Sequence, residues 1–263
     1  MKGNAPKAVS DRAVNPFDAI AARMEGLSGA MSQNDGVRIF NDLYLAVTRA
    51  VGAEFANDRF EDPAFLSRLA PIFSNLYFDA VERDAAKCTV SRVWAPLFEK
   101  RFQSGIAPLQ FVIAGMNAHI NYDLAIALVA ASRELGYDLE LDSAHHRDHV
   151  RVNTTLARVM DEVREHFETT IARSVVTALG MFDQFRRIER ARENTWTQAQ
   201  NLVALHDTPF KREQHLLARA RTVGFVSRTL LGQRCAQDLA VAPASAEPTY
   251  SRPAAAWRRG SPA

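Results

Sequence analysis

The chain has 263 residues, of which 24% are charged, and its formal net charge is +2. This length suits one large domain or two closely packed halves, and the near balance of charge gives no reason to expect nucleic acid or anionic lipid as a partner. Its two cysteines, Cys88 and Cys235, are too few for a disulfide framework, so we expect free thiols. Residues 1–15 contain no apolar signal segment, and we expect a cytoplasmic protein.

Both ends of the chain differ in composition from the rest. Residues 1–15 are small, polar and charged without periodicity, and residues 238–263 are dominated by Ala, Pro, Ser and Arg. Such segments cannot bury enough apolar surface to order themselves. We therefore predict disordered tails at 1–15 and 238–263 on either side of one domain at 16–237.

Between these tails, the chain consists of consecutive segments with helical periodicity. Apolar residues recur at helical spacing, and Asn-Asp-Gly, Asp-Pro and Thr-Pro start signals precede several segments. The predicted helices are 16–31, 37–55, 63–83, 93–102, 108–135, 144–167 (or as far as 179), 184–206 and 209–231. No period-two strand pattern, internal repeat, Gly-rich phosphate loop or nucleophile elbow appears. The sequence predicts an all-α fold, a single multi-helix globular bundle around a buried central helix.

That central helix is the segment 108–135, which Pro108 begins and Gly136 ends. Apolar residues occupy every side of it, so other helices should surround it. Its length would also allow it to cross a membrane. Polar groups are costly at a bilayer midplane, where four of its residues would lie, and we therefore predict a buried helix and no transmembrane segment. These four residues are Asn117, His119, Asn121 and Asp123.

The four polar residues form two pairs. His119 and Asp123 lie one turn apart on one face, and Asn117 and Asn121 lie about 200° away on another. Buried polar groups need hydrogen-bond partners, so neighbouring helices must supply them. One interpretation is a purely structural network. The other is a metal or acid/base site, because His and Asp at i, i+4 are a common helical ligand pair.

The next helix carries a second polar cluster near its beginning. When its apolar stripe is extended backwards by helical angle, His145 and His149 fall on the centre line. Asp148 falls on the edge of the stripe and Asn153 on its flank. Two imidazoles should therefore face the interior.

On the helix 184–206, Arg192 and Trp196 lie on or beside the inward stripe. A buried guanidinium requires a carboxylate, and Asp123 or Asp148 would be natural partners. The alternative is that Arg192 buries its stem and keeps its charged head in water.

The segment from Gly115 to Leu124 resembles the signature of a bacterial family of all-helical proteins of unknown function, marked by Ala-His-Ile-Asn-x-Asp-Leu. A second motif, Asp followed by an aromatic residue and Val-Asn, is similar to residues 148–153, with His149 in the aromatic position. A third is an Arg shortly before a Trp, here Arg192 and Trp196. The resemblance covers about residues 30–205 and implies the helical fold and this set of residues, but no reaction.

The spacing of His119 and Asp123 is also similar to one ligand segment of zinc-dependent phospholipase C and the related single-strand nucleases, which are all-helical. This resemblance implies a metal site. In the first functional hypothesis the chain is a metal-dependent enzyme, most simply a hydrolase. One divalent zinc, iron or manganese ion would be held by His119, Asp123, His145 and His149. Asp148 would serve as base or orienting group, Arg192 would take part in catalysis, and an open position would supply hydroxide.

Two further hypotheses remain. In one, the protein is a metal-free small-molecule-binding or cyclase-like protein whose apolar cavity orients one polar group of its ligand. The residues expected to contact the ligand are Asn117, Asn121, Asn153 and Trp196, with His119 and Arg192 beside them. In the other, the polar belt only fixes the register of the helices. The expected partner is thus a small-molecule substrate or ligand, and the oligomeric state is not predicted.

Overall fold

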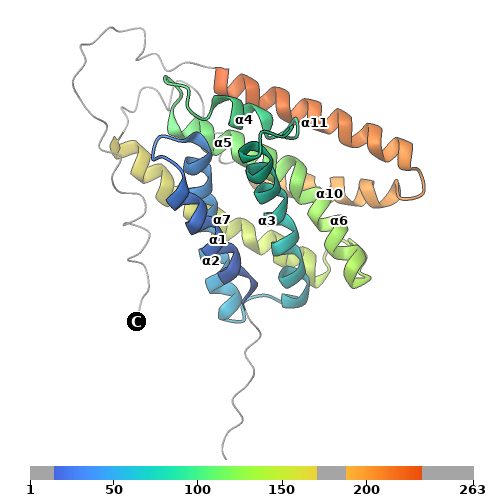
Figure 1. The fold of residues 1–263 in the computed structure, drawn as a ribbon. Coiled ribbons are helices and arrows are strands. Elements are labelled where there is room, and N and C mark those ends of the chain that lie inside the picture. The colour runs from blue at the N-terminus through green and yellow to red at the C-terminus, as the bar shows by residue number, and fades with distance from the viewer. Residues whose placement is uncertain (1–14, 171–187, 233–263) are drawn as a thin grey trace, which may run out of the picture.

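The computed structural model describes residues 15–170 and 188–232, and all regular secondary structure within these ranges is helical (Figure 1). This confirms the predicted all-α fold. The predicted tails and the segment 171–187 lie almost entirely outside the described residues. The helices are α1 (Pro16–Ala30), α2 (Gly36–Ala56), α3 (Pro63–Ala85), α4 (Ala95–Lys100), α5 (Pro108–Ala118), η1 (His119–Asp123), α6 (Leu124–Leu135), α7 (Ala144–Thr170), α10 (Ile188–Ala204) and α11 (Pro209–Gly232).

The helices begin where the sequence has capping residues. The side chains of Asn15, Asp35 and Asp62 each accept a hydrogen bond from a backbone N–H in the first turn of α1, α2 and α3. This satisfies donors that have no partner within the helix. Gly136 ends α6 with φ of 69°, in the left-handed region where glycine carries no steric penalty.

The central helix is one continuous segment, α5–η1–α6, but its middle is not a regular α-helix. Residues His119–Asp123 form a π-helical turn, in which the Leu124 N–H bonds to the His119 carbonyl. A π-helical turn contains one more residue than an α-helical turn, and such turns are frequent at functional sites. The sequence predicted an uninterrupted α-helix here, because nothing in the residue types distinguishes the two.

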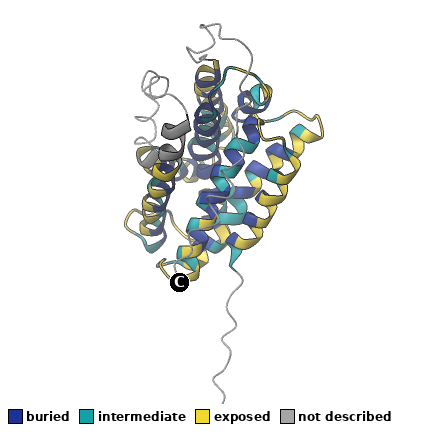
Figure 2. Cartoon of the chain, turned by 90° about the vertical axis from the view of Figure 1, so that its left-hand side faces the viewer, coloured by how far each residue is buried: buried dark blue, intermediate teal, exposed yellow. Residues whose placement is uncertain are grey.

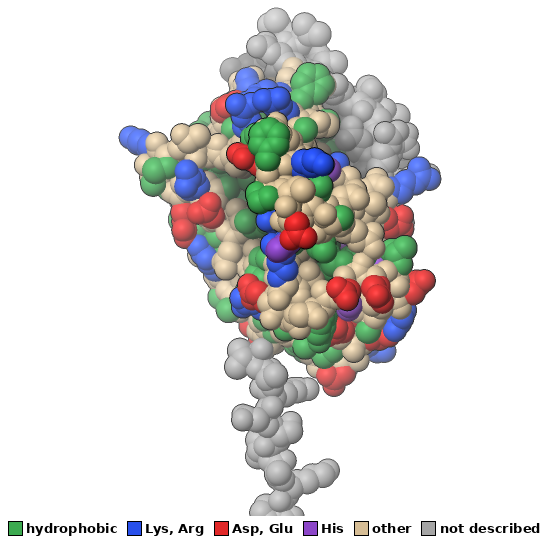
Figure 3. All heavy atoms as spheres, turned by 90° about the vertical axis from the view of Figure 1, so that its right-hand side faces the viewer, with side chains coloured by type: hydrophobic (Ala, Val, Ile, Leu, Met, Phe, Trp, Pro, Cys, Tyr) green, Lys and Arg blue, Asp and Glu red, His purple; other side chains and the backbone are tan. Residues whose placement is uncertain are grey.

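The other helices surround this central segment. It packs against α2, α3, α10 and α11, and the inward faces of the outer helices are buried whereas their outward faces are exposed (Figure 2). The segment Pro108–Leu135 is long and apolar enough to cross a membrane, but 78% of its most apolar window is buried inside the bundle. This is the environment of a core helix. On the face of the molecule in Figure 3, acidic and basic side chains are interspersed.

Gly115 allows α5 and α2 to approach closely. A Cβ atom added at Gly115 would lie 2.3 Å from the Cδ2 atom of Phe40, which is far inside van der Waals contact. The Phe40 ring therefore packs directly on the backbone of α5. In turn it lies 5.4 Å from the Trp94 ring and 6.3 Å from the His119 ring, measured between centroids.

Candidate functional site

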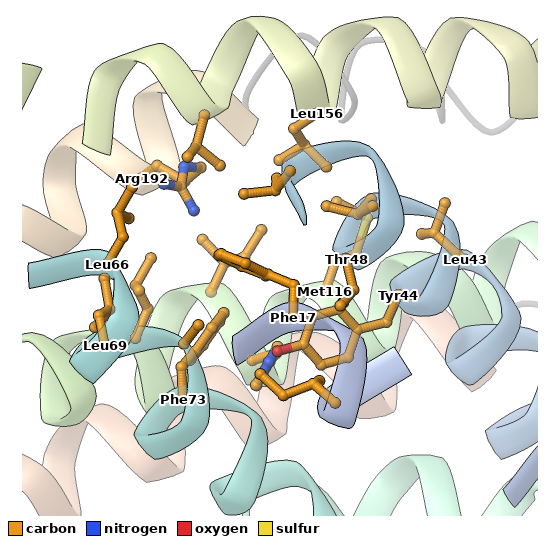
Figure 4. Close-up of a pocket in the computed structure, with 18 of the residues that line it drawn as sticks. Phe17, Leu43, Tyr44, Thr48, Leu66, Leu69, Phe73, Met116, Leu156 and Arg192 are labelled. Atoms are coloured by element: carbon orange, nitrogen blue, oxygen red, sulfur yellow. The ribbon is translucent and has the colours of Figure 1, made fainter. Parts of the chain in front are cut away.

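A cavity of about 110 Å³ lies beside the π-helical turn. Residues of α1, α2 and α3 line it together with residues of the central helix, α7 and α10 (Figure 4). Most of these side chains are aliphatic or phenylalanine. The exceptions, which carry polar atoms, are Tyr44, Thr48, His119, His149 and Arg192. The cavity is thus an apolar space with a few polar groups around it, which is the usual form of a small-molecule site.

His119 and Asp123 contact each other as their spacing predicted. The Nδ1 atom of His119 lies 3.1 Å from Oδ2 of Asp123, and Trp94 Nε1 donates to the same oxygen at 2.9 Å. The Phe73 ring stacks on the imidazole at 3.6 Å between centroids and 7° between planes. The Tyr44 ring meets it edge-on at 4.6 Å. Aromatic rings therefore fix the orientation of the imidazole.

Burial sets the protonation of this pair. It lowers the pKa of His119 below 6.5 and raises the pKa of Asp123 above 3.8, and their mutual contact opposes both changes. A neutral imidazole whose Nδ1–H faces the carboxylate has its lone pair on Nε2. That Nε2 atom is buried and has no hydrogen-bond partner in the described part of the chain. His119 therefore presents one open acceptor next to the cavity.

Arg192 reaches the cavity from α10, and its side chain points inward (Figure 4). Its Nε donates to Asn153 Oδ1 at 2.5 Å, and its Nη2 donates to the His149 carbonyl at 3.0 Å. The prediction that Asp123 or Asp148 would pair with it is wrong, because both carboxylates lie elsewhere with other donors. The alternative of a head in water is also wrong, since the residue is only 6% exposed.

His149 supports this guanidinium. Its Nε2 lies 3.1 Å from the Arg192 carbonyl, so Nε2 carries the proton and Nδ1 is an acceptor. That Nδ1 lies 3.4 Å from Arg192 Nη2. Burial and the neighbouring guanidinium hold the pKa of His149 well below 6.5, which keeps the ring neutral. Both ring nitrogens are therefore engaged with Arg192.

The other two residues of the cluster at the start of α7 have structural contacts. His145 places Nε2 at 2.9 Å from the Asp138 carbonyl and Nδ1 at 3.6 Å from Asp62. Asp148 accepts from the backbone N–H groups of Glu61 and Asp62, at 2.9 and 2.7 Å. Neither residue lines the cavity.

The four expected metal ligands are therefore not brought together. Within residues 15–170 and 188–232, no group of three or more His, Cys, Asp or Glu side chains is arranged to hold a metal ion. His119 and Asp123 contact each other. His145 instead contacts Asp138, and His149 contacts Arg192. Metal binding stays a prediction.

The expected ligand-binding residues also lie in different parts of the structure. Asn117 faces α11, where its Nδ2 donates to the Val223 carbonyl and to Ser227 Oγ, and Asn121 donates to Asn117. These two asparagines hold α11 and do not line the cavity. Asn153 acts through Arg192, as described above.

Trp196 is 1% exposed and lies among the rings of His145, His146 and His149, at 4.8 to 5.8 Å between centroids. Like the asparagines, it is not among the cavity-lining residues. It packs behind His149 and so supports the wall from which Arg192 reaches inward.

Sequence reasoning missed the aromatic residues that surround His119, namely Tyr44, Phe73 and Trp94. Each lies on an apolar stripe that reads as ordinary core, and no local pattern connects residues so far apart in the chain. One weak signal was present: a buried indole N–H needs an acceptor, and Trp94 directly precedes α4, the helix before the central helix with its buried Asp123.

Fold and site together define an all-helical protein with a largely apolar cavity. The cavity is bordered by His119, which contacts Asp123, and by Arg192, which has no ionic partner among the described residues. The chain belongs to a family of unknown function (DUF5995), which matches residues 17–233. Comparison with curated proteins and with solved structures finds no significant match. The predicted membership of an all-helical family of unknown function is thus confirmed at that level, and the likeness to phospholipase C and single-strand nucleases stays a prediction.

Proposed function

We propose that this protein binds a small, largely apolar molecule in the cavity between α2, α3, α7 and the π-helical turn. The observation that supports it is the cavity itself, about 110 Å³ of space lined mostly by aliphatic and aromatic side chains. Protein interiors are close-packed, and unfilled spaces of this size are few. An engineered apolar cavity of roughly 150 Å³ binds benzene, and the space here is of the same order and not fully enclosed, so a small ring or a short alkyl chain is the size of ligand that we expect.

The rigidity of the surroundings also supports binding. The stacked Phe73 and the edge-on Tyr44 hold His119 in place, and Asn153 and His149 hold Arg192. Polar groups that are oriented before the ligand arrives do not lose conformational entropy on binding. The cavity therefore offers a fixed arrangement of one acceptor and one cationic donor beside an apolar space.

The experiment titrates the protein with hexanol and with benzyl alcohol by calorimetry and follows the melting temperature. Ala70 lines the cavity from α3, and Ala64 lies exposed on the same helix. Wild type and Ala64→Leu should bind at least one alcohol and melt at a higher temperature with it. Ala70→Leu should fill part of the space and lose binding. If wild type binds neither, or if Ala70→Leu binds as wild type does, the proposal fails.

A metal-dependent enzyme is the second candidate. One observation favours it: the open Nε2 of His119, whose other nitrogen contacts a carboxylate as in many zinc-bound histidines. It has less support because His145 and His149 use both nitrogens on other partners. Elemental analysis of protein purified without chelators or a His tag tests it. About one metal ion per chain, lost in His119→Gln, would favour it over the first candidate.

A further inference from the structure

Among the residues that the structure describes, Arg192 is a buried cation without a countercharge. All of its hydrogen-bond acceptors are neutral: the amide oxygen of Asn153, and the carbonyl and Nδ1 of His149. No carboxylate of the described residues forms an ion pair with it. Burial lowers its pKa to about 10, so the guanidinium remains charged at neutral pH.

The other ionisable groups at the cavity cannot supply that charge. Burial raises the pKa of the Tyr44 phenol, which stays neutral, and the imidazoles of His119 and His149 are neutral as well. Asp123 receives the indole N–H of Trp94 and the contact of His119. An unpaired buried charge is among the most costly features of a folded protein, and an anionic ligand would give this one a partner.

The guanidinium is also only partly used. Nε and Nη2 donate to protein acceptors, whereas Nη1 makes no hydrogen bond with any residue in the described ranges. Because the side chain lines the cavity, its free edge borders the space in which a ligand would lie (Figure 4). Nη1 is therefore the free arm of the planar guanidinium fork, and its two N–H groups can donate charge-assisted hydrogen bonds to a carboxylate.

We propose that the ligand of the cavity is an apolar carboxylate, whose carboxylate pairs with Arg192 while its short alkyl chain or ring lies among the side chains of α2 and α3. This inference rests on the proposed binding function and specifies its ligand class. The size of the cavity limits the apolar part to about the size of benzene or a short alkyl chain. Inorganic anions lack the apolar part and would gain nothing from the rest of the lining.

The test compares hexanoate, hexanol, hexylamine and inorganic phosphate by calorimetry on the full chain. Charge-assisted hydrogen bonds are roughly twice as strong as neutral ones, and the ammonium would meet a like charge. Wild type should therefore bind hexanoate roughly 10-fold to 100-fold more tightly than hexanol, and hexylamine and phosphate hardly at all. This comparison needs no variant and so does not depend on the folding of one.

Two substitutions of Arg192 and one control test whether this residue causes the preference for hexanoate over hexanol. Arg190 is exposed on the same helix and is the matched control. Arg192→Met should lose the preference for hexanoate and keep hexanol binding, which shows that the cavity is intact, whereas Arg190→Met should behave as wild type. Arg192→Lys keeps the charge without the fork and should show an intermediate preference.

The outcomes separate the two proposals. Equal affinity of wild type for hexanoate and hexanol, or hexanoate binding that survives in Arg192→Met, would overturn the carboxylate assignment and leave the binding cavity standing. Phosphate binding as tight as hexanoate binding would also overturn it, in favour of a plain anion site. If no organic probe binds at all, the proposed function itself fails.

Discussion

The carboxylate of Asp148 accepts two backbone N–H groups, from Glu61 at 2.9 Å and from Asp62 at 2.7 Å, although these residues lie 87 and 86 positions away in the chain. Asp62 in turn caps α3 through Phe65. This residue was expected to act as a base or as an orienting group, and in the structure its oxygens hold the backbone at the beginning of α3. The wall of the cavity that α3 forms therefore depends on a side chain of α7.

Replacing Asp148 with Ala should lower the free energy of unfolding by about 2 kcal/mol, because two partly buried N–H groups lose their acceptor. Asp148→Asn keeps one acceptor oxygen and should lose about half as much. Urea denaturation measures both. Asp79 lies exposed on α3, so Asp79→Ala is the control and should change stability little. A loss in Asp148→Ala no larger than in the control would contradict this assignment.

At the scale of elements, the contact between α2 and α5 depends on the absence of a side chain at Gly115. Gly115→Ala would place Cβ 2.3 Å from the Phe40 ring, whose displacement would disturb Trp94 and His119. We expect a loss of about 1–3 kcal/mol of stability, as for other overpacked cores. Thermal and urea denaturation measure it.

The matched control is Gly26→Ala in α1, where an added Cβ meets no atom within 4 Å. Alanine is the better helix former by roughly 0.5–1 kcal/mol, so this variant should be as stable as wild type or more so. A loss of stability in Gly115→Ala together with a gain in Gly26→Ala would show that packing against Phe40 determines the effect at Gly115. Equal effects would mean that the close approach of Phe40 is unimportant.

For the whole molecule, buried neutral histidines make stability depend on pH. The pKa values of His119 and His149 lie below 6.5 in the folded chain, so the unfolded chain takes up protons first as the pH falls. Stability should be complete above about pH 6.5 and decrease below it, by up to about 1.4 kcal/mol per pH unit for each histidine. Asp123 acts in the opposite direction, because its raised pKa favours the folded state at low pH.

Urea midpoints at pH 7.5 and pH 5.5 measure this dependence. His149→Gln should reduce the change of the free energy of unfolding with pH by up to the equivalent of one proton, and His206→Gln, at an exposed position, is the control. An unchanged slope in His149→Gln would show that this ring is not the neutral buried group that the structure indicates.

The sequence alone determined the helices and, to within a few residues, where they begin and end, because capping residues, proline and apolar periodicity act within a few residues of one another. It did not determine the π-helical turn in the central helix. It also determined that His119 contacts Asp123, since i, i+4 spacing brings side chains together on any helix. Only the tertiary structure decided what each inward-facing group meets. Asn117 meets α11, Asp148 meets α3, and Arg192 meets neutral acceptors and a cavity. The physical reason is that helical angle fixes a direction, whereas the partner comes from an element far away in the chain.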